Sequence, residues 1–416
     1  MNKQRIAEDY RFYHEHLYHK ILPFWLQKAF DREYGGCYTC FNNSGEKLIS
    51  TDKYLWSQGR VVWLYSKLAE INKGNSDYLR LAEEGYDFLR KYALLPNGHC
   101  AFLVSREGIP KEPMAGKGYD TSIYADCFVV LGFAKYAMVA GEKEAFRKAL
   151  ALYQSIIARI EANSFPTEPE PIPKGYRSHG VTMILLNITQ ELLAAADSLD
   201  APEADQLRER CHALVLDLTD FQTDDGRVHE LIKNSDTKGT DPCIFGRFMN
   251  PGHSLEDMCF ILHYAVEAGM DEVVAQALKV TETMFNLGWD QEYGGLLHFV
   301  DKDGGKPRGE VGEFVGHPML AKLEGTWDDK LWWVHSEALY TTLLAYRLSG
   351  KKELLAQYQK VKDYSFQTFP HQNNGEWIQI RDRQGKPVDK VVALPVKDPF
   401  HIARNLLLLL ELLEKW

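Results

Sequence analysis

The feature that most constrains the fold of this chain is a pattern that recurs six times. In each copy, a short cluster of small or polar residues leads into a helix that is apolar on nearly every side. The copies begin at Trp56, Asp120, Ser178, Pro251, Trp332 and Pro399. Marker residues near these starts lie 65, 57, 74, 82 and 66 residues apart, so one copy occupies close to one sixth of the 416-residue chain. A repeat of this length predicts six structural units, each built on one buried helix.

Amphipathic helices with charged outer faces lie between the buried ones. Segments 78–95 and 143–162, for example, have apolar residues at spacings of three and four. A helix that is apolar all round must be covered on every side, and six such helices ringed by six amphipathic ones form an (α/α)6 barrel. We therefore expect an all-α fold of this kind. A superhelical solenoid of helix pairs is the alternative, and it would lack a closed pocket.

Short glycine-rich segments connect the helices. Two of them, from Asp31 and from Asp290, share the pattern DxEYGG, and similar pieces start at Pro96, Asp224 and Asn373. Each is expected to form a short β-hairpin at one rim of the barrel.

No linker rich in Pro, Gly or Ser divides the chain. The Pro-rich stretch 167–177 is short enough to be a loop over the third unit. Residues 1–416 are therefore expected to form a single catalytic domain.

Charge and composition exclude several classes of protein. The net charge is −10 and the Lys and Arg residues are scattered, so nucleic acid finds no basic stripe to bind. The longest apolar run, Leu406–Leu410, is far shorter than the roughly 20 residues of a membrane span. The charged start does not resemble a secretory signal, and seven irregularly spaced cysteines suit a reducing compartment, so we expect a cytoplasmic location. Cys37 and Cys40 form a lone CxxC, which favours two ordinary thiols over a zinc or redox site.

Polar side chains gather in the first turns of the six buried helices. If these helices begin at one end of the barrel, their first-turn residues converge on one mouth, where a ligand can bind. Four histidines share this register in successive copies, which favours a functional site over isolated core residues. The set comprises Arg60, His179, His253, Glu256, His335, Glu337, His401 and Arg404.

Motifs for several other kinds of catalysis are absent from the sequence. HExxH, GxSxG, GxxxxGK[ST] and a GxGxxG after a strand do not occur, so neither a metal site nor a nucleotide cofactor is indicated. We expect no cofactor and acid–base chemistry by imidazoles, whose ordinary pKa near 6.5 suits proton transfer at neutral pH. Aromatic residues such as Trp56 and Trp332 suit a sugar, because aromatic faces stack on the CH groups of a pyranose.

Six motifs, in order along nearly the whole chain, resemble those of the N-acylglucosamine 2-epimerase family. This family includes the mammalian renin-binding protein and, more distantly, cellobiose 2-epimerases and bacterial aldose–ketose isomerases. NPGHxxE and WWxHSEA are the most specific of the motifs. The six are KYLWSQGRVVWLY from Lys53, CAFLVSREG from Cys100, GRFMNPGHSLE from Gly246, GWDQEYGGL from Gly288, KLWWVHSEA from Lys330 and PFHIARNL from Pro399.

The resemblance implies an (α/α)6 barrel and interconversion of the C2 epimers of a sugar without a redox cofactor. It assigns His253 of NPGH and His401 of PFH as the two general acid/base residues. Arg60 of QGR and Arg247 of GRxxNPGH match positions that bind substrate oxygens, and Glu256 matches the carboxylate one turn after the first histidine. In some relatives a nucleotide modulates activity, so the resemblance also points to a nucleotide effector, and to a homodimer.

Two features bear on the substrate. His179 matches a histidine of the cellobiose and isomerase branches that the renin-binding protein branch lacks. The segment LEDMCFIL departs from the LEAGWFLL that is usual in the N-acyl branch, and extra residues lie between Asp301 and Lys330. The expected substrate-binding residues are Arg60, Trp56, His179, Arg247, Glu256, Trp332, Glu337 and Arg404.

The first hypothesis is therefore an isomerase that interconverts N-acyl-D-glucosamine and N-acyl-D-mannosamine. An epimerase or aldose–ketose isomerase of an unsubstituted sugar, such as mannose, glucose or cellobiose, is the alternative with the same chemistry. A glycoside hydrolase on the same barrel would need a facing carboxylate pair, for which Asp120, Asp126 and Glu337 are candidates. A protein-binding module would leave the converging histidines unexplained.

Overall fold

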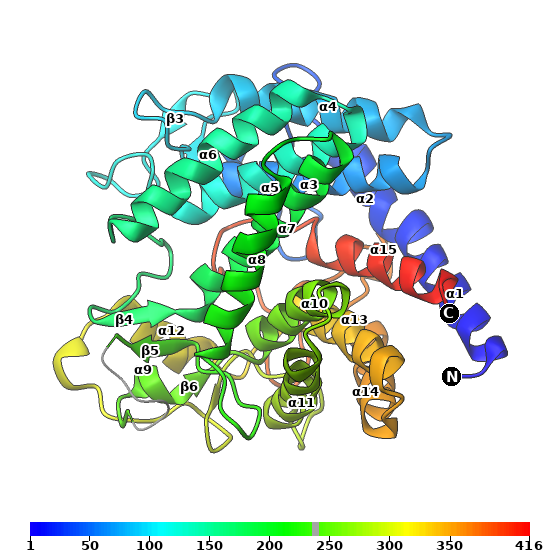
Figure 1. Ribbon diagram of the computed structural model, residues 1–416, viewed down its shortest axis with the longest axis vertical. Helices are drawn as coiled ribbons and strands as arrows, with labels where there is room; N and C mark the ends of the chain where they lie inside the picture. Colours follow the sequence, from blue (N-terminus) through cyan, green and yellow to red (C-terminus); the bar gives the residue numbers. More distant parts are fainter. Residues whose placement is uncertain (235–240) are drawn as a thin grey trace.

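The inner layer of the fold consists of the six apolar helices expected from the repeat. The computed structural model describes residues 1–234 and 241–416. Within this part, most side chains of these six helices are buried. Each helix begins within a few residues of its predicted start (Figure 1). They are α3 (Leu55–Ile71), α5 (Ile123–Ala140), α7 (His179–Ser198), α10 (Pro251–Glu267), α13 (Trp332–Ser349) and α15 (His401–Glu414).

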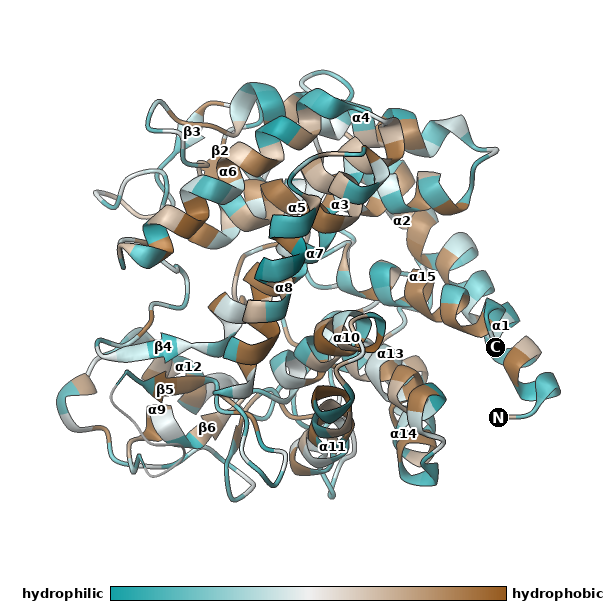
Figure 2. Ribbon diagram, in the orientation of Figure 1, coloured by the Kyte–Doolittle hydropathy of each residue, from teal (hydrophilic) through white to brown (hydrophobic). Residues whose placement is uncertain are grey.

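An outer layer of amphipathic helices covers them. Each outer helix buries one face and exposes charged residues on the other, and Figure 2 shows these alternating hydrophobic and hydrophilic positions. The (α/α)6 barrel is thereby confirmed. The outer helices are α1 (Lys3–His16), which continues through the π-helical turn η1 (Leu17–Ile21) into α2 (Leu22–Lys28), and α4 (Ser76–Tyr92), α6 (Lys143–Glu161), α8 (Ala204–Thr219), α11 (Asp271–Gly288) and α14 (Lys352–Thr368).

The ring closes where the first inner helix, α3, meets the last, α15. Nζ of Lys67 on α3 lies 2.8 Å from Oε1 of Glu411 on α15. At the other end of the same interface, Nη2 of Arg60 lies 3.2 Å from Nε2 of His401. Ion pairs and a polar contact therefore join helices that are more than 300 residues apart.

Four small antiparallel sheets line the rim where the inner helices begin. In each sheet, the strand directly before an inner helix pairs with the strand that follows the next outer helix: β1 with β2, β4 with β5, β6 with β7 and β8 with β9. Within the described residues, these sheets tie four of the six helix pairs together at one end. The strands are β1 (Lys53–Tyr54), β2 (Leu103–Val104), β3 (Pro110–Lys111), β4 (Tyr176–Ser178), β5 (Leu231–Lys233), β6 (Phe248–Met249), β7 (Val300–Asp301), β8 (Lys330–Leu331) and β9 (Ile380–Arg381).

This pairing differs from the hairpins expected within the DxEYGG segments. The segment from Asp31 closes on the isolated bridge Phe30–Cys37, and the segment from Asp290 on the bridge Trp289–Leu296. The two glycines of each motif have positive φ and turn the chain tightly. After the first motif, the extended residues form a further antiparallel bridge, Phe41–Leu48, whereas after the second motif they pair across the repeat as β7 with β6. Strands β2 and β3 form a hairpin.

The aspartate of each DxEYGG motif is the centre of a buried ionic cluster. Oδ2 of Asp31 accepts hydrogen bonds from Nζ of the fully buried Lys53, at 3.0 Å, and from Nε of Arg106, at 3.0 Å. The lysine belongs to β1, so the cluster anchors the strand that leads into α3. The second motif repeats this set with Asp290, Lys330 and Arg383.

The extra residues between Asp301 and Lys330 form a small lobe beside the rim. They hold the 3₁₀ turn η2 (Gly312–Phe314) and α12 (Pro318–Thr326), which pack near the short helix α9 (Ile244–Arg247). A separate apolar cluster supports the lobe and includes Phe245, Phe248, Phe299, Met319 and Leu323.

Helix α5 is long and apolar enough to cross a membrane by length and composition alone. Of the qualifying window, 78% is buried inside the structure, which is the usual position of a core helix in a soluble barrel. Among the described residues it is the single helix that meets this criterion.

Helices α3 and α5 approach closely at Gly59, and we predict that a larger residue there lowers the stability of the fold. A methyl group on Gly59 of α3 would lie 2.0 Å from the carbonyl oxygen of Phe128 on α5. Since backbone cannot move aside as a side chain can, we expect Gly59→Ala to lower the free energy of unfolding by about 1–3 kcal/mol or more. Denaturant unfolding followed by circular dichroism measures this change.

The matched control is Gly325→Ala in α12, where an added methyl group has no neighbour within 4 Å. It should leave stability unchanged or raise it slightly, because alanine favours a helix over glycine by about 0.5–1 kcal/mol. Equal effects of the two substitutions would show that the α3–α5 contact is not tight.

Candidate active site

A cavity of about 160 Å³ opens at the rim where the inner helices begin. All six inner helices contribute side chains to its wall. The Pro-rich loop, with Thr167, Pro169 and Glu170, lies at its edge as expected. Residues of the wall include Trp56, Arg60, Tyr124, Phe128, Met183, His253, Glu256, Phe260, Trp332, Trp333 and His401.

His253 stands in the first turn of α10, whose start is capped by Asn250. Nδ1 of His253 lies 2.9 Å from Oε1 of Glu230, a buried carboxylate directly before β5. A carboxylate can only accept, so Nδ1 carries the hydrogen and Nε2 holds a free lone pair. Burial is the largest single influence and would lower the pKa of His253. The charge and hydrogen bond of Glu230, together with the charges of Glu256 and Asp257, outweigh it and raise the pKa above its ordinary value.

His401 at the start of α15 is held in the same way. Its Nδ1 lies 2.7 Å from Oε1 of Glu337 on α13, so Nδ1 donates and Nε2 is the acceptor nitrogen. Nη2 of Arg60 lies 3.2 Å from that Nε2. Both histidines therefore present Nε2 as a base while a carboxylate fixes the tautomer and the ring orientation.

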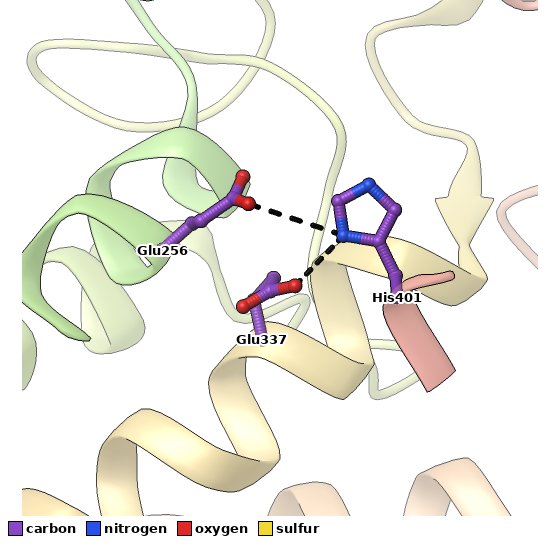
Figure 3. A group of neighbouring side chains, drawn as sticks. All are labelled: Glu256, Glu337 and His401. Atoms are coloured by element: carbon purple, nitrogen blue, oxygen red, sulfur yellow. Dashed lines mark hydrogen bonds and ion pairs between the residues drawn. The ribbon is translucent and has the colours of Figure 1, made fainter. Parts of the chain in front are cut away.

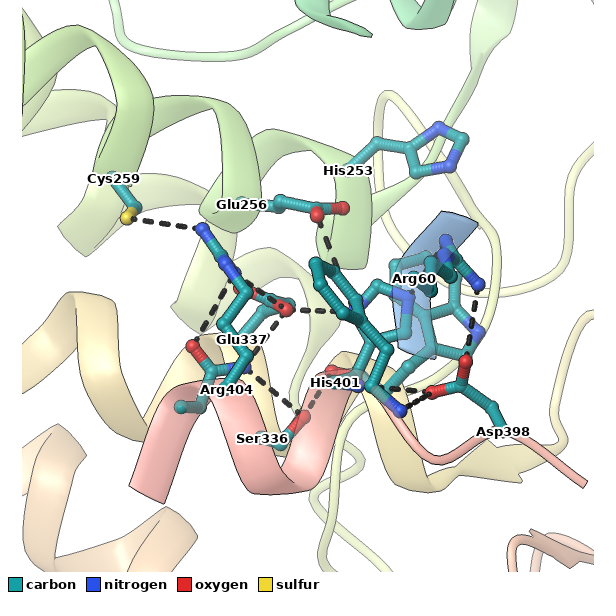
Figure 4. Close-up of polar contacts among 12 residues, drawn as sticks. Arg60, His253, Glu256, Cys259, Ser336, Glu337, Asp398, His401 and Arg404 are labelled. Carbon is teal, nitrogen blue, oxygen red and sulfur yellow. Dashed lines mark hydrogen bonds and ion pairs between the residues drawn. The ribbon is translucent and has the colours of Figure 1, made fainter. Parts of the chain in front are cut away.

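The two imidazoles come from different helices and share one aromatic neighbour. The Trp333 ring lies 5.3 Å from the His253 ring and 5.8 Å from the His401 ring, centroid to centroid. Figure 4 shows both histidines with Glu256 and Arg60 beside them. A small molecule in this cavity would meet a base from each of two walls.

Arg60 is the cation of the cavity wall nearest to His401. Nη1 of Arg60 donates to Oδ1 of Asp398 at 3.2 Å, and its guanidinium lies 4.1 Å from the centroid of the Phe128 ring. The other oxygen of Asp398 accepts from the peptide N–H of His401. One carboxylate thus positions both the cation and the first residue of α15 (Figure 4).

Glu256 faces the cavity one turn after His253. Within the described residues its carboxyl group has no hydrogen-bond partner, and Nδ1 of His401 is 4.0 Å away. Burial, and then the negative charge of Glu337, raise the pKa of Glu256. Its carboxyl group is therefore available to a hydroxyl group of a ligand.

Glu256, Glu337 and His401 lie close enough to suggest a cation site (Figure 3). One potential ligand atom of each lies within 4.8 Å of the others. However, Nη1 of Arg404 donates to both oxygens of Glu337, at 3.1 and 3.0 Å, and His401 uses Nδ1 as a donor. A buried guanidinium beside an already satisfied carboxylate makes this group a poor site for a metal ion.

The cavity wall contains six of the residues predicted from the sequence to act on or bind substrate. They are Trp56, Arg60, His253, Glu256, Trp332 and His401.

The other four predicted residues lie elsewhere, so the geometry does not support direct contact with substrate for them. Glu337 and Arg404 are buried behind His401. His179 is buried behind Glu230. Arg247 binds Asp301 of β7 instead, with 2.6 Å between Nη2 and Oδ1. His179, Arg247 and Arg404 are bound by carboxylates of the protein, and the carboxylate of Glu337 is bound by His401 and Arg404.

His335, the fourth histidine in the shared register, has a structural role. Its Nε2 accepts the peptide N–H of Leu296 at 2.9 Å, and Nδ1 donates to the carbonyl of Leu331. In the first copy of the motif, Gln58 takes the same position and accepts the peptide N–H of Cys37. Burial lowers the pKa of His335 to about 3, so this imidazole stays neutral.

Three residues near the cavity were not predicted from the sequence. No local sequence pattern marks Glu230, because it is the pairing of β4 with β5 that brings it to His253. His298 and Lys322 line the cavity from the segment after α11 and from α12. Lys322 forms an ion pair with Glu170 at the rim.

Cys37 and Cys40 are buried free thiols, in agreement with the interpretation of the lone CxxC as ordinary cysteines. Burial raises the pKa of Cys40 to about 12, so the thiolate that a metal or redox site needs is disfavoured.

The buried Glu337–Arg404 pair is expected to be essential for stability. Burial opposes ionisation of Glu337, but Arg404 and His401 hold its pKa below the ordinary value. Glu337→Gln leaves the guanidinium without a counter-charge, and we expect the free energy of unfolding to fall by about 3–5 kcal/mol at pH 7. The difference should narrow as the pH falls from the ordinary glutamate pKa of 4.5 toward the lower pKa of folded Glu337, because the unfolded wild type then takes up a proton that the folded protein does not bind.

Glu84→Gln is the control for this substitution. Glu84 forms exposed ion pairs with Arg80 and Arg32, so its loss should change stability by less than about 1 kcal/mol. Urea unfolding at several pH values measures both variants. A loss with Glu337→Gln that does not depend on pH would argue against a charge effect.

Comparison with known proteins places this site in a family. Residues 36–404 match the family described as N-acylglucosamine 2-epimerase (GlcNAc 2-epimerase). The chain is 31% identical over 401 residues to the N-acylglucosamine 2-epimerase of Bos taurus, with 95% of this chain and 89% of the bovine one covered.

Solved structures share the fold at lower identity. A cellobiose 2-epimerase from Bacillus thermoamylovorans aligns with a TM-score of 0.77 and 20% identity over 97% of this chain and 98% of the other. A D-mannose isomerase aligns with a TM-score of 0.74 and 17% identity, and the alignment covers 97% of each chain. The match over most of the sequence and the bovine relative show that this chain belongs to the N-acylglucosamine 2-epimerase family.

Proposed function

We propose that this protein is a cofactor-independent sugar 2-epimerase that interconverts N-acyl-D-glucosamine and N-acyl-D-mannosamine. The observation that carries the proposal is the pair of histidines, His253 and His401, which offer Nε2 as a base from two walls of one cavity. The substrate is taken from the curated relatives, which are named N-acylglucosamine 2-epimerases.

The reaction begins on the open-chain sugar, in which C2 lies beside the C1 carbonyl. One imidazole takes the proton from C2, and the electron pair moves into the carbonyl to form a planar enediolate-type intermediate. The other imidazole, in its protonated form, then returns a proton to C2 from the opposite face. Each histidine serves as base in one direction and as acid in the other. Atoms and charges balance in each turnover, and proton exchange with water restores the starting protonation of the two imidazoles.

Arg60 and Glu256 would stabilise and hold this intermediate. The Arg60 guanidinium is the fixed positive charge beside His401, where it can bind the oxygen that gains negative charge. The free carboxyl group of Glu256 can bind a sugar hydroxyl. Trp56, Trp332 and Trp333 supply the aromatic faces against which a sugar ring packs.

An epimerase or aldose–ketose isomerase of an unsubstituted sugar is the second candidate. His179, together with the likeness in fold to a D-mannose isomerase and a cellobiose 2-epimerase, favours it. An isomerase would form the same intermediate but return the proton to C1.

A glycoside hydrolase is less consistent with the contacts. Of the carboxylates considered for it, Asp120 lies 2.7 Å from Nδ1 of His99, and Asp126 lies 2.8 Å from Nη2 of Arg159. Glu337 is bound by Arg404. None of the three faces another carboxylate across the cavity.

The location and assembly of the protein remain part of the proposal. Seven free, buried cysteines are consistent with a reducing compartment, which supports a cytoplasmic location. A single domain over residues 1–416, a homodimer and a nucleotide effector stay predictions.

The substrate is tested by incubating the protein separately with N-acetylmannosamine, mannose and cellobiose and following the products by NMR. We expect N-acetylglucosamine to form from N-acetylmannosamine, with little change in the other two sugars. Turnover of mannose without turnover of N-acetylmannosamine would favour the second candidate.

The two-base mechanism is tested by removing one base at a time. His401→Asn and His253→Asn should each lower epimerisation by about a hundredfold or more. In deuterium oxide, however, each variant should still exchange the C2 hydrogen of one epimer, because the remaining imidazole can remove and return that proton. The two variants should act on different epimers.

The wild type, which exchanges and epimerises both sugars, is the reference. Exchange of the same epimer by both variants would place the two histidines on one face and contradict the mechanism.

A further inference from the structure

His179 and Asp257 form a buried pair that the proposed reaction does not use. Neither side chain has any exposed surface, and Nε2 of His179 lies 2.9 Å from Oδ2 of Asp257. On its other side, Nδ1 of His179 lies 3.9 Å from Oε2 of Glu230. Oε1 of that same glutamate binds Nδ1 of His253.

These contacts form one row of alternating carboxylates and imidazoles: Asp257, His179, Glu230 and His253. We propose that the Asp257–His179 dyad is a positioning device that holds Glu230 and thereby sets how readily His253 gives up and takes a proton. The inference rests on the proposed function, because it assigns a task to residues that act through the base His253.

The geometry of the helices explains why this row can exist. Asp257 follows Glu256, and neighbouring residues of a helix point about 100° apart. Glu256 therefore faces the cavity while Asp257 faces α7. The peptide N–H of His179 donates to the carbonyl oxygen of Glu230 at 2.9 Å, which places the imidazole beside the glutamate.

The hydrogen on His179 is determined by its two neighbours. With an ionised Asp257 and a neutral His179, Nε2–H donates to Asp257 and the lone pair of a bare Nδ1 faces Glu230. With one more proton in the pair, either His179 is an imidazolium or the carboxyl group of Asp257 donates to Nε2. In these two forms an N–H points toward Glu230, and the proposed dyad holds this additional proton.

Two atoms of the dyad lack partners of their own. Nδ1 of His179 and Oδ1 of Asp257 are buried without a hydrogen bond to any described residue. Unpartnered polar atoms in the interior are unfavourable, so their retention in one contact suggests a role beyond packing. The ionic form relieves part of this penalty because the imidazolium lies between two carboxylates.

The effect on His253 follows from the charges around it. Glu230, Glu256 and Asp257 favour its protonated form, and burial opposes it. His298, a neutral cavity residue, lies near it, and Arg60 and His401 line the same cavity. A positively charged His179 beside Glu230 weakens the attraction of that carboxylate for the proton on His253. Without this positive charge, the pKa of His253 would rise further, and a smaller fraction of the imidazole would be available as a base.

The test compares three variants in the pH dependence of kcat/KM for N-acetylmannosamine. His179→Gln should move the acidic limb to higher pH by about one unit, the size of a nearby charge effect. At pH 7 this shift lowers kcat/KM by up to tenfold, and raising the pH restores it. Asp257→Asn should shift the limb in the same direction by less, since an amide can still donate to Nε2.

His335→Gln is the matched control. It replaces an equally buried first-turn histidine whose hydrogen bonds go to backbone groups only, and Gln58 already makes the equivalent hydrogen bond in the first repeat. Its pH profile should match that of the wild type. Unshifted profiles in His179→Gln and Asp257→Asn would overturn the proposal.

A measurement on the wild type keeps the inference testable if a variant fails to fold. With ¹⁵N-labelled histidine, NMR should show a hydrogen on Nδ1 of His179 at neutral pH, and a bare Nδ1 would overturn the dyad. If the wild type turns over no sugar, the proposed function fails and the ¹⁵N result still decides the protonation of the dyad. If it turns over sugar but the profiles do not shift, only the dyad is wrong.

Discussion

The site depends on one constraint, that all six inner helices begin at the same rim. Strand pairs enforce it for four of the six, α3, α7, α10 and α13, because the residues before each of these helices are bonded to those after the next outer helix. Buried lysines reinforce it: Lys53 and Lys330 tie the strands that lead into α3 and α13 to the aspartates of the DxEYGG motifs. Because the starts of the helices are fixed, the side chains in their first turns all lie at the same mouth of the barrel.

Much of this arrangement can be predicted from the sequence, because it is periodic. The six apolar segments give the number, order and starts of the inner helices, and first-turn residues such as His253 and His401 then converge. What the sequence does not contain is the rotation of each helix about its axis. His335 has the same register as these two, yet its helix turns it toward the peptide of Leu296 instead of the cavity.

Residues that act through another chain segment are also beyond local sequence signals. Glu230 lies in a glycine-rich connection with nothing to mark it, and only the pairing of β4 with β5 brings it to His253. Arg247 shows the opposite case, in which a motif marks a residue whose charge is taken by Asp301, a partner 54 residues away. In both cases long-range pairing decides which polar atoms are left for a ligand.

The same arrangement of charged and polar groups lies behind both proposed bases, although different residues form it. Each imidazole donates Nδ1–H to a buried carboxylate, Glu230 or Glu337, and each carboxylate has a second nitrogen-containing side chain on its far side, His179 or Arg404. A carboxylate alone would bind the proton of an imidazolium too strongly. In a reversible epimerisation each histidine must both release and accept a proton, so neither form can be much more stable than the other. A carboxylate whose charge is partly offset by a neighbouring nitrogen group fixes the imidazole ring and still lets it release its proton. This gives a physical reason for the polar layer behind the cavity wall.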